Sequence, residues 1–362
     1  MKFPITRKLS LLTTVLAILL MADPCVPQTS NRTLQTEHRV WIRSDATHED
    51  IAQLSTILGI KSVAVEGTSV DPTRMSELFA AIQHLSDLEE LSILAGVVTD
   101  SEMSQIRSFK HLKVLRAFDN EISDEGLANV QDLTGLEELA LDSNHRITAN
   151  GLKYLNRLTR LRVLRLYGAP LDDSAIAEIS ELRDLEDLQL GKARITDRSI
   201  ADLSRFQKLK TLDLQGTLVT SDGLRYLDDL DQIRWLCLAR TRVDSSGLFH
   251  LRKLTRIEWL FLPFTNIDDE GLLALSQMRQ LRNLDLTSTK ITDRGLDYLV
   301  GFSNLESLKV NETNVSDKGL TSLRRLPHLR YIEVFGTEVT SKGIEQFRSA
   351  MPNTEIRITK NY

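Results

Sequence analysis

The side chains that most often carry catalysis or bind metal ions are scattered along this chain. None of its seven histidines belongs to an HExxH motif, and no two lie four residues apart on a predicted helix beside a carboxylate. The two cysteines, Cys25 and Cys237, exclude a disulfide framework and a four-cysteine zinc site. No GxSxG, P-loop or GxGxxG motif occurs in a suitable context. We therefore predict no catalytic residue, metal site or cofactor.

Aromatic side chains offer a different chemistry, the recognition of a partner. Only 6% of the 362 residues are aromatic, yet Trp235, Trp259, Phe261 and Phe264 occur close together. A cluster of aromatic side chains rimmed by polar groups is the usual form of a binding hot spot. Whether these four side chains share one surface depends on the elements that carry them.

Those elements come from a repeat of 24 residues. An LxxLxL pattern recurs at this spacing, except for one step of 25 residues between Leu136 and Leu161. Weaker copies precede and follow the array, as expected for terminal repeats that must cap it. The eleven full copies begin at Leu88, Leu112, Leu136, Leu161, Leu185, Leu209, Ile233, Ile257, Leu281, Leu305 and Leu329.

Each repeat predicts a short strand, a turn and a short helix. Leu284 and Leu286 alternate with an exposed Asp285, which is strand periodicity, whereas Leu296, Leu299 and Phe302 recur every three residues, as in a helix or 3₁₀ segment. One unit cannot bury its apolar edge alone, so stacked units must share a continuous core and one parallel sheet.

The repeated phrase TxITDxGLxxLxxL, as in residues 289–302, resembles leucine-rich repeat proteins of the ribonuclease-inhibitor-like and cysteine-containing subclasses, and the chain as a whole a secreted bacterial type. The resemblance covers residues 37–358 and implies an α/β solenoid shaped like a horseshoe. The parallel sheet would line the concave face, short helices the convex face, and protein recognition would be the activity. The sequence departs from the family where Thr replaces the usual Asn or Cys after most strands, for example at Thr217 and Thr289.

Three polar columns suit a scaffold. We expect the Thr hydroxyls to bridge neighbouring coils, because buried peptide groups need partners. An Asp after Ser or Thr suits a helix N-terminus, and a following Gly allows adjacent coils to approach closely. No calcium-binding loop pattern surrounds these acids, so we interpret them as structural. The recurring acids are Asp124, Asp173, Asp197, Asp269, Asp293 and Asp317.

In-register stacking aligns the outward strand residues into columns and gathers the aromatic side chains into one exposed patch on adjacent strands. The alternative is that these rings only cover the sheet and pack on one another. We expect a protein or peptide partner to contact the patch, its polar edge and further aromatic positions of the same face. The predicted contact residues are Tyr167, Asp213, Trp235, Arg240, Trp259, Phe261, Phe264, Asn283, Asp285, Tyr331 and Phe335.

Two other functions remain open from the sequence. Aromatic platforms beside Asp and Asn also stack on sugars, so a cell-surface adhesion or polysaccharide-binding protein is the alternative. An enzyme using Cys237 would need a base that the sequence does not place beside it. The net charge of −5 argues against a nucleic-acid partner.

The N-terminus has the pattern of an export signal. Lys2, Arg7 and Lys8 precede an uncharged, mostly apolar run from Leu9 to Ala22, which is short for a membrane span. We expect a secreted, periplasmic or cell-envelope protein that meets a membrane only if this segment stays uncleaved. The predicted segments are 1–22, signal peptide or anchor; 23–36, linker; 37–87, degenerate N-terminal capping repeats; 88–352, eleven repeats; and 353–362, C-terminal capping strand.

Overall fold

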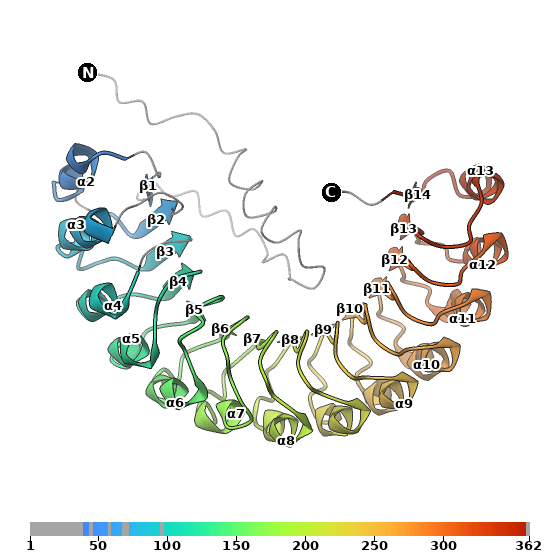
Figure 1. The fold of residues 1–362 in the computed structure, drawn as a ribbon, viewed down its shortest axis with the longest axis horizontal. Helices are drawn as coiled ribbons and strands as arrows, with labels where there is room; N and C mark the ends of the chain where they lie inside the picture. Colours follow the sequence, from blue (N-terminus) through green and yellow to red (C-terminus); the bar gives the residue numbers. More distant parts are fainter. Residues whose placement is uncertain (1–38, 43–45, 57–58, 67–71, 95–97, 360–362) are drawn as a thin grey trace. The chain divides into compact units, whose positions relative to one another are not determined.

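The computed structural model describes residues 39–42, 46–56, 59–66, 72–94 and 98–359. Within them, fourteen parallel strands form one open sheet in which the spatial order equals the sequence order. In Figure 1 these strands line the inner side of an arc and the helices its outer side. The predicted fold class, an α/β leucine-rich repeat solenoid, is confirmed.

The strands are short, and each pairs in register with the next one along the chain. They are β1 (Arg39–Ile42), β2 (Ser62–Glu66), β3 (Glu90–Leu94), β4 (Val114–Phe118), β5 (Glu138–Ala140), β6 (Val163–Arg165), β7 (Asp187–Gln189), β8 (Thr211–Asp213), β9 (Trp235–Cys237), β10 (Trp259–Phe261), β11 (Asn283–Asp285), β12 (Ser307–Lys309), β13 (Tyr331–Glu333) and β14 (Glu355–Arg357).

The outer side carries α-helices and 3₁₀ helices of at most eleven residues. The α-helices are α2 (His48–Leu54), α3 (Pro72–Ile82), α4 (Asp100–Ile106), α5 (Asp124–Leu127), α6 (Ala149–Leu152), α7 (Ala175–Glu178), α8 (Asp197–Ile200), α9 (Ser245–Leu248), α10 (Asp269–Ala274), α11 (Asp293–Tyr298), α12 (Asp317–Leu323) and α13 (Ser341–Ala350). The 3₁₀ helices are η1 (Ala128–Val130), η2 (Lys153–Leu155), η3 (Ala201–Arg205), η4 (Ser221–Leu227), η5 (Phe249–Lys253), η6 (Leu275–Gln277) and η7 (Leu299–Gly301).

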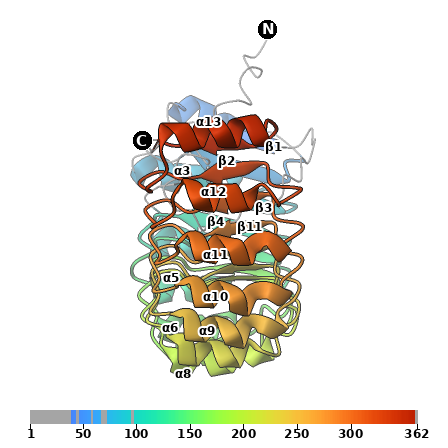
Figure 2. The same ribbon diagram turned by 90° about the vertical axis from the view of Figure 1, so that its right-hand side faces the viewer.

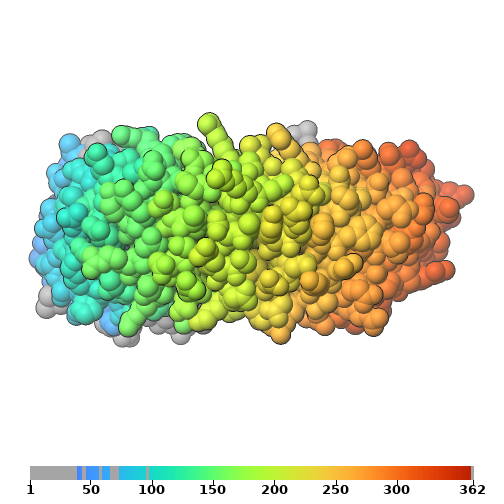
Figure 3. Space-filling model, turned by 90° about the horizontal axis from the view of Figure 1, so that it is seen from below, coloured from blue at the N-terminus to red at the C-terminus, as the bar shows by residue number. Residues whose placement is uncertain are grey.

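One coil shows how the sequence produces this arrangement. Leu284 of β11 and Leu286 just after it are buried in the core, and Leu296 of α11, Leu299 of η7 and Phe302 reach the same core from the other side. The apolar positions of every coil meet those of its neighbours, so the core runs the length of the stack. Figure 2 shows α9 to α13 stacked one above another, and in Figure 3 the coils follow one another across the outer surface in sequence order.

The Asp column joins each coil to the next through the start of its helix. Asp197 accepts hydrogen bonds from the backbone N–H of Thr220 at 2.8 Å and from its Oγ1 at 2.5 Å. Gly223 leaves room for this carboxylate, since a Cβ there would lie 2.3 Å from Asp197 Oδ1. We call this unit of Asp, hydroxyl residue and Gly the interlock. The predicted scaffold role of the acids is confirmed by equivalent bonds at Asp100, Asp124, Asp173, Asp269, Asp293 and Asp317.

Two interlocks reverse the polarity of the pair without losing it. Ser221 stands where Asp is usual, and Asp244 stands where the next coil usually has a hydroxyl. Ser221 Oγ donates to Asp244 Oδ1 at 2.7 Å and accepts from the Asp244 N–H at 3.0 Å. Ser245 and Asp268 repeat the exchange in the following coil. The bonds between coils therefore persist because both positions change together.

The Thr column forms a different hydrogen bond from the one that we predicted. Thr217 Oγ1 donates to the carbonyl of Leu214 at 2.7 Å, within its own coil, and Thr241 and the later members do the same. The prediction that these hydroxyls bridge coils is wrong, because the carbonyl three residues back is the nearest acceptor. Asn144 does bridge, by accepting from the Ile122 N–H and donating to the Ala117 carbonyl.

Candidate functional site

The strand register places the predicted contact residues side by side on the concave face. Trp235, Trp259 and Asn283 are direct partners on β9, β10 and β11. Two residues further on, Phe261 lies between Cys237 and Asp285, and Cys237 in turn pairs with Asp213 of β8. The predicted alignment of outward residues into columns is thus confirmed for this part of the sheet.

The aromatic cluster, which we define as Trp235, Trp259 and Phe261, is more buried than predicted. The rings of Trp235 and Phe261 lie 5.2 Å apart between centroids, and these side chains are only 7% and 9% exposed. The expectation that they stand open to solvent is wrong for these two side chains, because their rings pack against each other across β9 and β10. Trp259 remains 41% exposed, so the cluster has one accessible indole above a packed base.

Cys237, which lies in the same outward column as Asp213 and Phe261, is fully buried. It is disulfide-bonded, so the described structure offers no free thiol at this place. Cys25, like the predicted signal segment 1–22 and linker 23–36, lies outside the described residues. The hypothesis of a catalytic thiol therefore gains no support from the site.

The turn after each strand carries a feature that we did not predict. One residue per coil has a positive φ, and seven of these ten residues are not glycine. We call them the rim column because they border the concave face. Bulky residues rarely adopt this left-handed conformation, which costs on the order of 1–2 kcal/mol. The rim column consists of Asp119, Ser143, Gly168, Lys192, Gly216, Arg240, Phe264, Ser288, Glu312 and Gly336.

Two cations of the rim column lie over aromatic rings. The Arg240 guanidinium is 3.9 Å from the centroid of the Phe264 ring, and Lys192 Nζ is 4.8 Å from that of Tyr167. Phe264 has a φ of 57° and is 42% exposed. Phe264 therefore does not pack into the aromatic cluster. It forms a separate cation–aromatic pair with Arg240 at the border of the cluster.

A signal for this rim exists in the sequence. Gly168, Gly216 and Gly336 occupy the same repeat position as Arg240 and Phe264. A position that accepts glycine in several coils predicts a left-handed turn in the others, because stacked coils share one backbone path.

The centre of the concave face is acidic, and its carboxyl groups differ in their environment. Asp142 pairs with Arg165 at 2.9 Å, yet burial raises its pKa. Burial raises the pKa of Asp187 to about 6, although a hydrogen bond from Gln189 opposes this effect. Burial also raises the pKa of Asp285, against the attraction of Lys309. These groups suit electrostatic recognition, since none is paired with a nucleophile or a leaving-group site.

The remaining predicted contact residues lie away from the aromatic cluster. Tyr167 follows β6, three strands from β9, and its hydroxyl accepts a hydrogen bond from Gln215 at 3.1 Å. Tyr331 of β13 lies three strands from β10 and donates to Glu333, while Arg357 stacks over its ring. Phe335 follows β13 and accompanies Tyr331 at the C-terminal end of the sheet. The structure thus separates the predicted set into a central group and two outlying ones.

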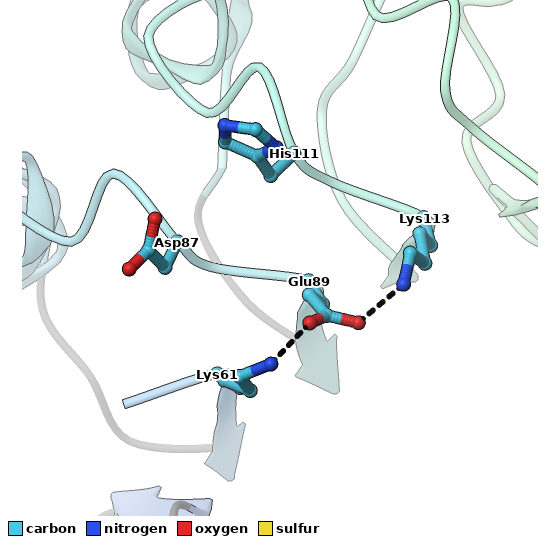
Figure 4. A pocket seen from close by; sticks show the side chains of 5 residues that line it. All are labelled: Lys61, Asp87, Glu89, His111 and Lys113. Atoms are coloured by element: carbon cyan, nitrogen blue, oxygen red, sulfur yellow. Dashed lines mark hydrogen bonds and ion pairs between the residues drawn. The ribbon is translucent and has the colours of Figure 1, made fainter. Parts of the chain in front are cut away.

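A surface hollow near the N-terminal end gathers charged side chains of both signs. It is lined by Lys61, Asp87, Glu89, His111 and Lys113 (Figure 4). Glu89 bridges Lys61 at 2.7 Å and Lys113 at 2.6 Å, and hydrogen bonds from these two lysines lower its pKa to about 2. A carboxylate held so firmly in its charged form suits an ion bridge between coils and not general acid catalysis.

Other site types can be considered only for the part of the chain that the structure describes. There, no group of three or more His, Cys, Asp or Glu side chains is placed to hold a metal ion. Over the same residues, none of the helices has the length and apolar character that crossing a bilayer requires.

Comparisons with known proteins agree with the fold. A leucine-rich repeat family model matches residues 277–300. An internalin from Listeria monocytogenes has 21% identity and a TM-score of 0.63, with 88% of this chain and 90% of that chain covered. A leucine-rich repeat protein from Leptospira interrogans has 17% identity and a TM-score of 0.48, with 85% and 92% covered. None of the curated proteins matches. The leucine-rich repeat fold suggests a protein–protein interaction module, a class that is generally non-enzymatic.

Proposed function

We propose that this protein binds a protein or peptide partner on the concave face of its leucine-rich repeat solenoid. The observation that carries the proposal is the accessible indole of Trp259, 41% exposed, on a base formed by Trp235 and Phe261. Partly exposed aromatic anchors backed by a packed surface are enriched among binding hot spots. Asp213, Asn283 and Asp285 lie beside this cluster in the strand register.

The sheet supports binding through its rigidity. Every described strand of the arc is held by its neighbours on one or both sides, and most junctions between coils from Asp100 to Thr340 are fastened by an interlock. Such a surface loses little conformational entropy when a partner docks, so a modest contact area suffices for affinity. The outlying positions Tyr167, Tyr331 and Phe335 would serve an extended ligand that follows the arc.

The test compares accessible aromatic side chains on the two faces of the coil. A photo-crosslinking amino acid is introduced at position 259 on the concave face or at 249 on η5, where Phe249 is 47% exposed. We expect a defined cross-linked partner from envelope extract only with the probe at position 259. Trp259→Ala should abolish capture by an immobilised protein, whereas Phe249→Ala should leave it unchanged. Equal capture by both variants would contradict the proposal.

A second function is a cell-surface adhesion protein that binds polysaccharide. The observation that favours it is the same exposed Trp259, which lies beside Asn283, since an indole and a polar neighbour can stack on and hydrogen-bond a sugar. A glycan array probed with the wild type and with Trp259→Ala separates the two functions. Carbohydrate binding that depends on Trp259, without a protein cross-link, would replace the first proposal by the second.

Export is part of the same proposal. The basic and apolar character of residues 1–22 supports a secreted or periplasmic location for a protein of the ribonuclease-inhibitor-like and cysteine-containing repeat pattern. We expect fractionation to recover the protein outside the cytoplasm, and N-terminal sequencing to show whether residues 1–22 are removed. A protein found only in the cytoplasm would contradict this expectation.

A further inference from the structure

We propose that the rim column binds an acidic segment of the partner through Lys192 and Arg240, with carboxylates as the recognised groups. This inference rests on the proposed function, because it specifies the chemistry of a partner that meets the concave face. The two cations lie on the border of that face, beside the aromatic cluster but not within it.

The first argument is that these two cations, unlike other cations of the concave face, have no ion-pair partner among the described residues. On the concave face, Arg165 is paired with Asp142 at 2.9 Å, and Arg116 with Glu90 and Glu138. In the described part of the chain, neither Lys192 nor Arg240 forms an ion pair within 4.0 Å. Both side chains are exposed, and each has an aromatic ring on one side. Their remaining N–H donors are therefore available to an external acceptor.

The second argument is the geometry of the Arg240–Phe264 pair. A guanidinium stacked at 3.9 Å on a ring is held in one plane, so its donors are oriented before a ligand arrives. A planar donor fork matches the two oxygens of a carboxylate. The pair is maintained although both residues have a left-handed backbone, with φ of 55° and 57°, where glycine would be less strained. Strain retained at a surface position points to a use outside the fold.

The third argument is the order of charges along the rim column. Asp119 stands towards its N-terminal end and Glu312 towards its C-terminal end, with Lys192 and Arg240 between them. The cations are two coils apart, or about 10 Å at the usual strand spacing. Carboxylates three residues apart in a polyproline II segment lie on one side of it and are separated by about 9 Å. An acidic segment would thus contact both cations, and the acids towards the two ends of the rim column would repel any continuation of its negative charge.

A peptide fits better than a nucleic acid. Asp187, Asp213 and Asp285 line the neighbouring sheet, and the net charge of the chain is −5. A long polyanion lying over the rim column would meet these acids, whereas a short acidic segment can contact the two cations alone. We call the part of the sheet lined by these three acids the acidic sheet. A partner that also carries a cation beside the acidic segment could form an ion pair there.

The experiment measures binding of defined peptides to the full chain by fluorescence polarisation at low ionic strength. The probe is a labelled polyproline II peptide with two glutamates three residues apart in a Pro-rich background. Matched peptides carry glutamine or lysine at the same two positions, and a labelled single-stranded DNA serves as a long polyanion. We expect only the glutamate peptide to bind, with an affinity that falls as salt is added.

Variants assign the binding to the rim. Arg240→Gln and Lys192→Gln should each raise the Kd about tenfold, and Arg240→Lys should recover only part of the loss. Arg282→Gln is the matched control, since Arg282 is exposed but lies near Glu258 and Glu306, at 3.9 and 3.0 Å. Thermal unfolding checks that each variant is folded.

Three outcomes would overturn this inference: equal binding of the glutamate and glutamine peptides, an unchanged Kd in Arg240→Gln, or DNA binding as tight as that of the glutamate peptide. The proposed function is tested separately by cross-linking at position 259. A partner captured there, together with indifference to the acidic peptide, would remove only the rim inference.

Discussion

The interlocks and the rim column lie on different parts of the same coils and follow opposite rules. In an interlock, the carboxylate of Asp293 accepts three hydrogen bonds, from Ser316 N, Ser316 Oγ and Gly319 N, at 2.8, 2.6 and 3.0 Å. In the rim column, bulky side chains such as Phe264 occupy a left-handed conformation, and Arg240 lacks a carboxylate partner among the described residues. One region satisfies its polar groups within the chain. The other holds backbone strain and, in the described part of the chain, two cations without a carboxylate partner.

This difference matches the proposed function, in which the interlocks stabilise the solenoid and the rim column binds a partner. Substitutions in the interlocks should lower the free energy of unfolding, because every group there has a partner to lose. Substitutions in the rim column and on the acidic sheet should leave the free energy of unfolding unchanged or raise it. Their main effect should be on binding. The following predictions test that division, beginning with the largest expected effect.

Replacing the carboxylate of one interlock should cause the largest loss of stability. Asp197→Ser replaces both carboxylate acceptors of the bonds from Thr220 by a single neutral hydroxyl, and we expect the free energy of unfolding to fall by about 3 kcal/mol in urea denaturation. Adding Thr220→Asp recreates the reversed pair seen at Ser221 and Asp244 and should recover most of the loss. Asp229→Ala, at an exposed site, is the control. A double variant no more stable than the single one would contradict the reciprocal interlock.

Filling the space beside an interlock carboxylate should lower the free energy of unfolding somewhat less than replacing the carboxylate does. A Cβ at Gly295 would lie 2.4 Å from Asp269 Oδ1, so Gly295→Ala forces the carboxylate to move away from Thr292. We expect a loss of about 2 kcal/mol. Gly301→Ala is the matched control, because a Cβ there meets no atom within 4 Å. Similar thermal stability of the two alanine variants would show that the space at Gly295 is not needed.

Relieving strain in the rim column should have the opposite sign. Phe264→Gly removes a side chain from a residue with φ of 57°, and we expect the free energy of unfolding to rise by up to about 1 kcal/mol. The same variant should weaken binding of the acidic peptide, because Arg240 loses the ring beneath it. Phe264→Ala is the control, since it deletes the ring but keeps the strained Cβ. Destabilisation by Phe264→Gly would mean that the ring contributes mainly to packing.

The acidic sheet should give the smallest and most pH-dependent effect. Because the pKa of Asp187 is raised to about 6 in the folded state, its charge opposes folding above that pH and not below about pH 4. Asp187→Asn should therefore raise the free energy of unfolding by less than about 1 kcal/mol at neutral pH, with no gain at pH 4.

An exposed acid provides the reverse case. A hydrogen bond from Lys208 lowers the pKa of Asp184, so this carboxylate supports folding at neutral pH and loses that support as the pH falls through its folded value. Asp184→Asn should thus shift Tm downwards near neutrality, opposite in sign to Asp187→Asn. Parallel shifts of the two variants would contradict the difference in environment.

The sequence predicted the repeated parts of this molecule well because each of them obeys one local rule. The leucine spacing was sufficient for the strands and the common core, and the Ser/Thr-Asp pairs for the scaffold role of residues such as Asp197. The prediction for the Thr column failed because a hydroxyl such as that of Thr217 can bond either within its own coil or to a neighbouring coil. Residue spacing does not indicate which acceptor it takes.

The candidate site was predicted only in part. Register was sufficient to place Trp235 beside Trp259. It did not predict that Trp235 and Phe261 would be buried, since that depends on how the two rings pack against each other, which residue spacing does not report. The Arg240–Phe264 pair was missed for another reason, because its position depends on backbone dihedrals that no apolar periodicity reports.

The charges along the start of the strands affect how nearly identical coils find their proper neighbours. Glu258 lies between Arg234 and Arg282, and Arg282 lies between Glu258 and Glu306. The leucine columns would accept a neighbour displaced by one coil, but such a displacement places Glu258 beside Glu306 or Arg234 beside Arg282. Each ion pair stabilises the folded chain by less than about 1 kcal/mol. Their alternation instead distinguishes coils that the core treats as equivalent, and so disfavours skipped coils and exchange between two chains during folding.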